Sequence, residues 1–565
     1  MSEAKRNRTR WRGTGGKAAL AALMLTALSA GRSGHAFNIS TNNPDLKMRW
    51  DNTLKYSLGL RVEDPSSKVE GSAFNPNLDD GDRNFDRGLI SNRFDVLSEF
   101  DAKYRDFGLR LSGAAWYDFV YNARTDNDSP ATFNPISVDN DEFTNETRKL
   151  HGRKAELLDA FVFGKFNTGG ETALSVRAGR YTLLYGESLF LGANGIAAAQ
   201  APIDVVKLLS VPSSQFKEIG MPVAQLSGHF QVNPSLSLGA YYQLEWRKSR
   251  IPASGSYFSN VDLLDDGGER IIAGPPVAPG GGPAAFFRGD DIQARDRGQF
   301  GAQVKFKPAW GDVEYGLYAA RYHEKVPTVY IRPGVGAGPA TPVTGQVGDY
   351  VLVYPEDITV FGASFSTVVA DANVAGEVSM RRNMPLAATG GAVVTDSFAD
   401  GRHNPAYPVG NTFHAQISAI RLFPGNFLWG GATFLGEIGF NRRLSVSKNA
   451  NQLDPNVTRD AWGLRLVFEP QYFQVLPNVD LTVPLGLGWA PAGRSSLGPN
   501  VFGPEHGGDM SIGLTAQYQK TWKAGLQYTH FFGPAGAVLD EAAAFSFKQT
   551  MADRDFVSLS VQRTF

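Results

Sequence analysis

Residues 46–62 read LKMRWDNTLKYSLGLRV, and this stretch decides the fold class. Nearly every even-numbered position from Leu46 to Val62 is apolar, while the odd-numbered positions carry mostly polar or charged residues such as Lys47 and Arg49. A helix has 3.6 residues per turn and cannot place alternate residues on one face, whereas a strand does so. The stretch therefore predicts a β-strand with one apolar and one polar face.

The same alternation recurs to the end of the chain in about 18 segments. The predicted strands lie at 46–62, 92–104, 107–120, 155–166, 173–181, 222–232, 236–246, 298–307, 312–322, 358–368, 372–381, 412–422, 431–441, 459–469, 478–489, 509–518, 522–532 and 554–565. Tight turns such as Arg105-Asp106 tend to alternate with long connections such as 182–221. This organisation predicts an all-β, transmembrane, antiparallel up-and-down β-barrel of about 16 to 18 strands, with short periplasmic turns and long extracellular loops.

The first predicted hairpin has a definite register. With Arg105-Asp106 as its turn, Tyr104 faces Phe107 on the lipid side and Asp101 faces Arg110 on the inner side. Lipid-facing aromatic residues collect near the strand ends, as membrane barrels require at both interfaces. One predicted girdle comprises Tyr104, Phe107, Phe166, Phe230, Phe306, Phe468, Tyr518 and Trp522, and the other comprises Tyr117, Phe119, Trp246 and Trp489.

The first 36 residues have the composition of a secretory signal. Basic residues between Lys5 and Lys17 precede the apolar run 18–30, and Gly34-His35-Ala36 is a small-residue cleavage site. We expect residues 1–36 to be a cleavable signal peptide and residues 37–565 to form a single barrel domain in the outer membrane of a Gram-negative cell. Loss of this segment removes seven basic residues and one acidic residue, which leaves a net charge of about −7.

Composition argues against several other classes of protein. A mildly acidic chain without a basic stripe does not predict nucleic-acid binding, and the absence of cysteine excludes thiolate metal sites and a cysteine nucleophile. The eight histidines lack metal-ligand spacing, and no nucleophile motif is present, so we expect neither an enzyme nor a cofactor. A lumenal Ser, His and Asp site remains one alternative; a soluble β-solenoid or propeller is another, although no fixed repeat supports it.

Two acidic stretches of the predicted loops, 126–128 and 139–146, contain the oxygen ligands that Ca²⁺ prefers. No glycine completes an EF-hand pattern in either stretch. Solvated loop charge is therefore the favoured interpretation, and a loop-stabilising Ca²⁺ is the alternative.

The informative polar residues are those that the alternation or the connections direct inward. Charged side chains facing lipid at mid-membrane are costly, so these residues belong in a lumen, where they either pair with one another or set the selectivity of a path. The candidates for lining the lumen are Glu99, Asp101, Arg110, Asp159, Arg177, Glu187, Lys217, Glu218, Glu377 and Glu437.

The long connection 182–221 differs from the other predicted loops because it is unusually apolar. It contains the small-residue run 189–202 and then a short helical pattern at 203–209. We expect this connection to fold into the lumen, where it constricts the path and offers an apolar solute a surface to bind.

The last predicted strand alternates up to Phe565. This ending resembles the C-terminal signal by which the barrel-assembly machinery recognises outer-membrane barrels. Arg563 departs from the pattern because it falls on the lipid-facing row near the periplasmic rim, where its side chain would reach the headgroups.

Several blocks of the chain resemble a proteobacterial outer-membrane family catalogued as domain of unknown function 1302. They are Gly179-Arg180, Tyr185-Gly186-Glu187, Phe216-Lys217-Glu218 with Met221-Pro222, and residues 354–357, 375–385, 474–484, 495–496 and 554–559. The family pattern usually has Trp where this chain has Tyr185.

The resemblance implies an outer-membrane barrel that is commonly encoded beside a lipoprotein-like partner and an RND-type exporter. It suggests a channel or transporter for a hydrophobic or amphipathic organic solute of steroid-like or aromatic character. The alternative is a non-enzymatic structural or assembly partner of a lipoprotein or an RND-type export complex. The expected partners are the lipid bilayer, the assembly machinery through Phe565, the solute and a periplasmic or lipoprotein component.

Overall fold

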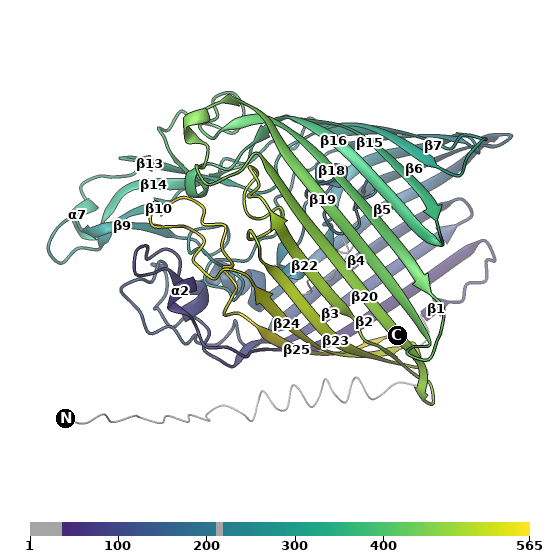
Figure 1. Ribbon diagram of the computed structural model, residues 1–565, viewed down its shortest axis with the longest axis horizontal. Helices are drawn as coiled ribbons and strands as arrows, with labels where there is room; N and C mark the ends of the chain where they lie inside the picture. The colour runs from purple at the N-terminus through teal and green to yellow at the C-terminus, as the bar shows by residue number, and fades with distance from the viewer. Residues whose placement is uncertain (1–36, 211–218) are drawn as a thin grey trace.

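Residues 37–210 and 219–565 are described by a computed structural model of the protein, so the predicted signal peptide lies outside the described residues. The main sheet has 20 strands and includes the short β1 (Phe37–Ile39) and one barrel strand that is divided into β21 and β22. Without β1, and with β21 and β22 counted as one strand, 18 strands form a closed antiparallel barrel, because the last strand, β25, pairs with β2 (Figure 1). No helix in these residues is both long and apolar enough to cross a bilayer.

The predicted barrel architecture is confirmed strand by strand. The barrel strands are β2 (Leu46–Arg61), β3 (Leu89–Tyr104), β4 (Phe107–Asp118), β5 (Arg153–Gly169), β6 (Thr172–Tyr181), β7 (Val223–Asn233), β8 (Leu236–Gln243), β11 (Gln299–Phe306), β12 (Glu314–Tyr322), β15 (Ile358–Val369), β16 (Ala372–Pro385), β18 (Val409–Phe423), β19 (Gly431–Lys448), β20 (Asp460–Leu476), β21 (Val479–Thr482) with β22 (Leu485–Ala492), β23 (Gly508–Tyr518), β24 (Trp522–Phe532) and β25 (Phe556–Thr564). Each overlaps one predicted segment. The break between β21 and β22 falls at Pro484, which has no N–H to donate to the ladder.

The register of the first hairpin is also as predicted, since Tyr104 pairs with Phe107 and Asp101 with Arg110. At the same end of the barrel, β1 pairs with residues 48–50 of β2. It extends the sheet beyond Thr564, the last residue of β25, which pairs with Thr53. We call this end, which carries the short connections, the turn end.

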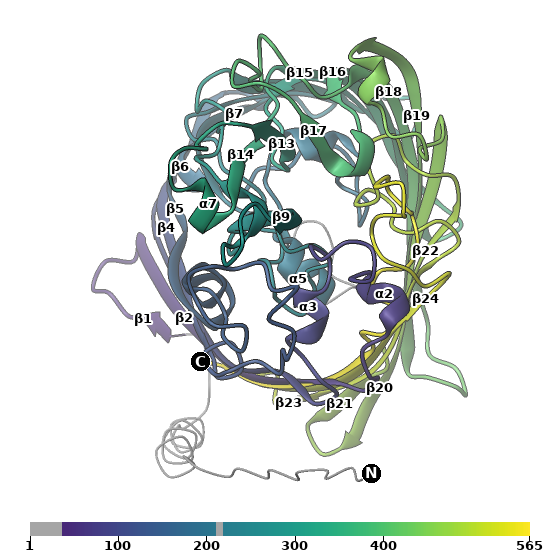
Figure 2. The same ribbon diagram turned by 90° about the vertical axis from the view of Figure 1, so that its left-hand side faces the viewer.

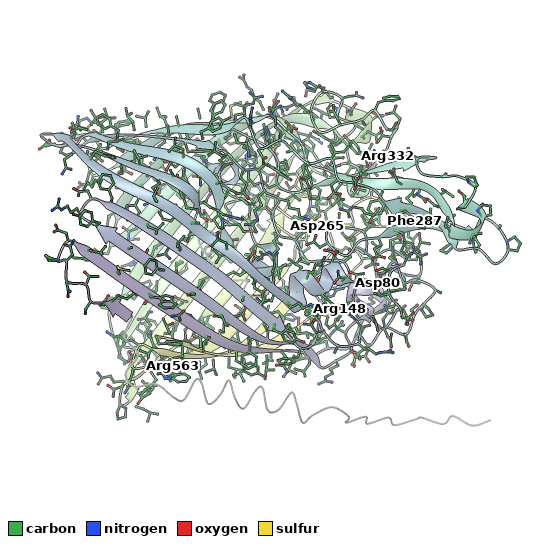
Figure 3. All side chains as sticks on the ribbon, turned by 180° about the vertical axis from the view of Figure 1, so that it is seen from behind. Asp80, Arg148, Asp265, Phe287, Arg332 and Arg563 are labelled. Carbon is green, nitrogen blue, oxygen red and sulfur yellow. The ribbon has the colours of Figure 1, made fainter. Side chains whose placement is uncertain are left out.

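The opposite end, the loop end, carries the long connections and most of the short helices (Figures 1 and 2). Three connections contribute to a second, five-stranded sheet, which projects from the barrel. Its strands are β9 (Arg270–Pro276), β10 (Pro283–Arg288), β13 (Thr328–Pro333), β14 (Gln346–Val353) and β17 (Ala392–Val394). Phe287 and Arg332, labelled in Figure 3, lie on this sheet, which the sequence did not predict.

The helices are short. They are α2 (Ser67–Glu70), α3 (Asp80–Arg83), α4 (Asn145–Thr147), η1 (Arg148–Gly152), η2 (Ile196–Ala199), α5 (Val205–Ser210), α7 (Thr341–Thr344), η3 (Thr389–Gly391) and η4 (Ala450–Gln452). Figure 2 looks onto the loop end, where α2 and α3 lie over the mouth of the barrel and α5 lies in the middle of the view. The long connections therefore cover part of the mouth.

The outer surface of the barrel is apolar, as a lipid-facing surface must be. Residues on the outward rows keep large exposed fractions, for example 54% for Val162 and 53% for Ile512. Tyr104 and Phe107 are exposed near the turn end, as predicted for one girdle. Trp246 is a wrong prediction: β8 ends before it, and its ring is buried against Tyr354 at the loop end, with ring centroids 4.7 Å apart.

The side chain of Arg563 packs against aromatic rings, whereas the sequence predicted that it would reach the headgroups. Its guanidinium carbon lies 5.1 Å from the ring centroid of Trp522 and 5.9 Å from that of Phe565, and only 7% of the residue is exposed. The two rings cover the charge through cation–π contacts. The arginine is therefore accommodated on this row by its aromatic neighbours.

Candidate functional site

The connection that follows β6 turns back into the barrel. Here residues 182–210 are called the inner segment. The ring of Tyr185 packs against Tyr241 of β8, with centroids 5.4 Å apart, and against Tyr318 of β12, at 6.4 Å. Tyr241 and Tyr318 are buried, whereas outward neighbours such as Tyr242 and Leu317 are exposed. The inner segment therefore begins on the inner face of the wall.

Two wall carboxylates, Glu377 of β16 and Glu437 of β19, hold the inner segment by its backbone. Glu377 accepts hydrogen bonds from the N–H of Glu187 at 2.6 Å and of Ile196 at 2.8 Å. Glu437 accepts from three consecutive N–H groups, those of residues 189–191, at 3.1, 2.6 and 2.6 Å. Both glutamates are at least nine-tenths buried. These two predicted lumenal residues are thus anchors for the inner segment.

Further wall residues complete the attachment. Arg381 donates to the carbonyl of Gly195 at 2.8 Å and to that of Ala193 at 3.0 Å. Asn194 contacts both His414 and Gln416 of β18. These residues point inward on the same alternation that identified Glu377, but the sequence did not indicate that they would meet residues 193–195.

Glu187 is the only sequence-predicted lumenal residue of the described inner segment. Its carboxylate accepts from the ammonium of Lys305 at 2.9 Å, and Lys305 also binds Glu314 at 3.1 Å. This ion pair ties the inner segment to β11 and β12. Lys217 and Glu218 lie outside the described residues.

Four of the predicted residues form one group on the neighbouring strands β3, β4 and β5. We call this group the Arg110 cluster. Arg110 of β4 pairs with Glu99, with Asp101 at 2.9 Å and with Asp159 at 3.4 Å. All four side chains are between 26% and 40% exposed, so they lie against solvent inside the barrel. Three carboxylates share one guanidinium, and the cluster therefore keeps a negative surplus.

Arg177 of β6 is not part of that cluster. Its guanidinium carbon lies 5.8 Å from the ring centroid of Phe161 on β5, and so the arginine makes a cation–π contact with the inner wall. The wall near β5 and β6 thus combines aromatic and cationic character.

The helix α5 gives the inner segment an apolar surface that is only partly covered. None of its residues is buried, although it lies near the middle of the end-on view in Figure 2 and includes Val205, Val206, Leu208 and Leu209. The charge of Lys207 of α5 acts on Lys55 of β2, and so does the charge of Lys523 of β24. Apolar side chains and ammonium groups therefore lie close together inside the barrel.

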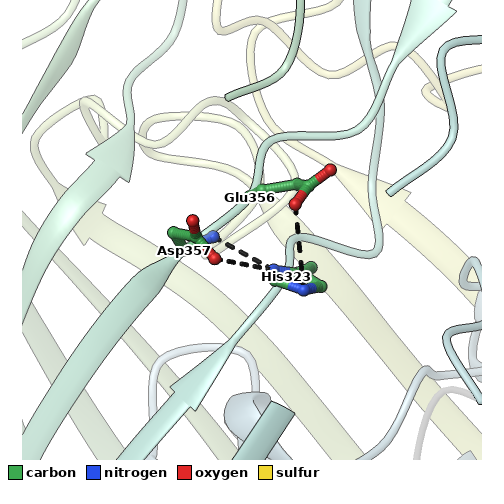
Figure 4. A group of neighbouring side chains, drawn as sticks. All are labelled: His323, Glu356 and Asp357. Carbon is green, nitrogen blue, oxygen red and sulfur yellow. Dashed lines mark hydrogen bonds and ion pairs between the residues drawn. The ribbon is translucent and has the colours of Figure 1, made fainter. Parts of the chain in front are cut away.

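A different group, His323, Glu356 and Asp357, brings possible metal ligands together at the loop end (Figure 4). The carboxylates are already paired, because Arg321 lies 2.7 Å from Asp357 and Arg295 lies 3.1 Å from Glu356. His323 Nδ1 accepts from the N–H of Asp357, and burial lowers the pKa of His323 to about 4. Arginines thus already occupy the positions from which a cation would neutralise these carboxylates.

The sequence agrees with one family along nearly its whole length. The model of the family described as "Protein of unknown function (DUF1302)" matches residues 17–565. The chain belongs to this family. The family membership that Tyr185-Gly186-Glu187 and the other blocks predicted is therefore confirmed. In the structure, Tyr185 and Glu187 of this block make contacts that attach the inner segment to the barrel wall.

Comparison with curated proteins finds no match to this DUF1302 chain. Among solved structures, OpdK of Pseudomonas aeruginosa with vanillate is similar at 11% identity and a TM-score of 0.38, covering 92% of this chain and 98% of that one. OccAB1 of Acinetobacter baumannii gives 10% identity and a TM-score of 0.41, covering 94% and 98%. The outer-membrane channel DcaP of Acinetobacter baumannii gives 9% and 0.36, covering 94% and 99%. Likeness this low carries no information about the solute of this chain.

Proposed function

We propose that this DUF1302 protein is an outer-membrane channel for a hydrophobic or amphipathic organic solute, and that the inner segment constricts its path. The supporting observation is the partly accessible apolar surface of α5 inside the barrel. Apolar side chains that neither face lipid nor fill a core are suited to contact a solute. The apolar outer rows of the barrel support its place in a membrane.

The charges near α5 refine the class of solute. Lys55 of β2 lies within electrostatic range of Lys207 of α5 and of Lys523 of β24, and its strongest charged neighbour is Asp95. A solute with an apolar body, of steroid-like or aromatic character, and a polar or anionic end matches this combination. The motif analysis gives no nucleophile, and we propose transport as the activity.

The experiment compares single-channel conductance in planar bilayers for three forms of the chain that begin at Phe37. These are the unchanged chain, a form in which residues 189–209 are replaced by a short Gly-Ser linker, and a control that lacks residues 334–345. The control removes the tip between β13 and β14, which lies outside the barrel. Higher conductance only in the 189–209 deletion supports the constriction.

Solute dependence is measured in the same membranes. Openings of the unchanged chain that a steroid-like carboxylate blocks, and that the 189–209 deletion makes insensitive to it, support the proposed solute class. A folded barrel that stays silent in both the unchanged chain and the 189–209 deletion contradicts the channel. That result favours the alternative role, a structural partner of a lipoprotein or an RND-type export complex.

A further inference from the structure

Three aspartates meet at the loop end, and none of them is among the wall residues that hold the inner segment. Asp79 and Asp80 come from the connection between β2 and β3, and Asp262 comes from the connection between β8 and β11. One carboxylate oxygen from each lies within 4.8 Å of the others, and none of the three residues is more than 1% exposed. Figure 3 shows Asp80 among the long connections. We call this group the three-aspartate cluster.

The cluster has less positive charge beside it than its carboxylates require. Arg83 lies 2.5 Å from Asp79, but it also pairs with Glu70. Among the residues that the structure describes, no lysine or arginine forms an ion pair with Asp80 or Asp262. Arg270 and Arg554 act on them only from farther away. Buried carboxylates without compensation are strongly disfavoured, and within the cluster Asp80 and Asp262 lack a directly paired cation in the described part of the chain.

Individual oxygen atoms show the same deficit. Asp79 Oδ1 and Asp262 Oδ1 are buried and accept no hydrogen bond. A third acceptor without a donor is Asn134 Oδ1, on a fully buried residue whose main-chain N–H donates to Asp80 at 3.1 Å. Buried acceptors are normally satisfied, so the unpartnered oxygens of Asp79 and Asp262, two residues whose carboxylates lie together, indicate a missing ligand.

The three oxygens and their surroundings match the chemistry of a hard cation. Ca²⁺ takes six to eight oxygen ligands from carboxylates, amide carbonyls and water. Here carboxylate and amide oxygens are present without nitrogen or sulfur ligands. This distinguishes the cluster from His323, Glu356 and Asp357, whose carboxylates are paired with arginines.

We propose that Asp79, Asp80 and Asp262 bind a divalent cation, Ca²⁺, which fastens the long connections over the mouth of the barrel. Three connections meet there, because Asn127, Thr132 and Asn134, from the connection between β4 and β5, donate hydrogen bonds to Asp79 and Asp80. Without the ion, the carboxylates of Asp79 and Asp80 repel that of Asp262 on the other connection. With the ion, all three carboxylates are its ligands. The sequence had pointed to 126–128 and 139–146 instead, and within these stretches Asn127 acts only as a hydrogen-bond donor to the cluster.

The test is calorimetric titration of CaCl₂ into the folded full-length barrel in detergent after treatment with EDTA. The unchanged protein is compared with Asp262→Asn and Asp80→Asn, which keep side-chain shape, and with the control Asp128→Asn, whose side chain is 93% exposed. We expect one site per chain in the unchanged protein and in the control. We expect at least a tenfold loss of affinity in the two cluster variants. A heat-dependent shift in gel mobility verifies that each barrel is folded.

Protease protection gives a second readout that needs no variant. Trypsin cleavage within residues 244–298 of the unchanged protein is compared in excess EDTA and in CaCl₂. Slower cleavage in CaCl₂ supports the proposal. No heat of binding together with equal cleavage overturns it, and so does binding that both cluster variants retain. These readouts are independent of permeation, so a silent channel leaves them unaffected.

Discussion

The carboxylate of Glu437 accepts a hydrogen bond of 2.6 Å from the main-chain N–H of Leu191. The two residues are 246 positions apart in the sequence, and this bond links the far wall of the barrel to the inner segment. Hydrogen bonds to a charged group contribute more than neutral ones, about 1.5 to 3 kcal/mol each. Glu437 and Glu377 together accept five such bonds from the backbone of the segment, and therefore set how firmly it is held.

Removal of both anchors is predicted to loosen the constriction. In the double variant Glu377→Ala, Glu437→Ala, five backbone N–H groups between residues 187 and 196 lose their acceptors, so the segment moves away from β16 and β19. Single-channel recordings should show higher mean conductance and noisier openings than the unchanged chain. The control is Glu99→Ala, which removes a lumenal carboxylate that pairs with Arg110. Equal conductance in the double variant and the unchanged chain would contradict the anchoring role.

The Arg110 cluster is predicted to influence ion selectivity. Arg110→Gln leaves Glu99, Asp101 and Asp159 without their shared cation, so the lumen becomes more negative at this point. The reversal potential in a KCl gradient should shift towards cation selectivity, and the shift should shrink at high salt because of screening. Ala114→Ser, a neutral change on an inward position of the same strand, serves as the control. An unchanged reversal potential would place the ion path away from this cluster.

Arg61 is predicted to be essential for the stability of the loop end. Its side chain is fully buried, lies 2.7 Å from Asp82 and 3.3 Å from Asp553, and donates to the carbonyl of Phe85 at 2.7 Å. Arg61→Met removes the ion pairs that Arg61 forms with two buried carboxylates, and breaking a buried pair costs about 3 to 5 kcal/mol. Urea unfolding in detergent, followed by tryptophan fluorescence, measures the free energy of unfolding.

The matched control for Arg61 is Arg49→Met. Arg49 pairs with Asp51 on the same strand, but its side chain is 57% exposed. Exposed ion pairs contribute about 0 to 1 kcal/mol. A similar loss of stability in both variants would show that the buried network around Arg61 has no special role.

The three-aspartate cluster predicts a response to pH that is present without Ca²⁺ and absent with it. Burial raises the pKa of Asp262 to about 8 and that of Asp79 to about 6, and it also raises the pKa of Asp80. An aspartate of the unfolded chain has a pKa of about 3.9. Because the folded values are higher, the protonated carboxyls favour the folded state at low pH, and this stability is lost as pH rises towards about 8.

Hydrogen exchange of residues 244–298 in EDTA should therefore become faster between pH 5 and pH 8 than the intrinsic change of exchange rate with pH accounts for. With CaCl₂ present, the ionised carboxylates are ligands, so this additional increase should be absent at pH 8. Asp262→Asn should remove most of the pH dependence in EDTA. An equal pH response with and without Ca²⁺ would contradict the coupling between the ion and these carboxylates.

Particular residues show how far sequence reasoning reached. The pairing of Asp101 with Arg110 followed from alternation and a two-residue turn, both of which are local. Trp246 was misplaced because the alternation continues beyond the end of β8, and only the packing of its ring against Tyr354 shows where the strand ends. Alternation selected Glu377 and Glu437 as candidate inward residues, but their role as anchors depends on a segment from elsewhere in the chain.

The sequence by itself determined the barrel class, the approximate number of strands, their order and the face on which most strand side chains lie. It could do so because successive residues of a strand point to opposite faces, and because strands that follow one another in the chain pair with each other in an up-and-down barrel. The tertiary structure alone decided which connections meet. Asp79 and Asp262 are 183 residues apart and have no shared local pattern, yet the N–H of Asp79 donates to Asp262 at 2.9 Å. Barrel closure brings their connections to one mouth, where the buried carboxylates of Asp79, Asp80 and Asp262 meet. No sequence motif predicts this cluster.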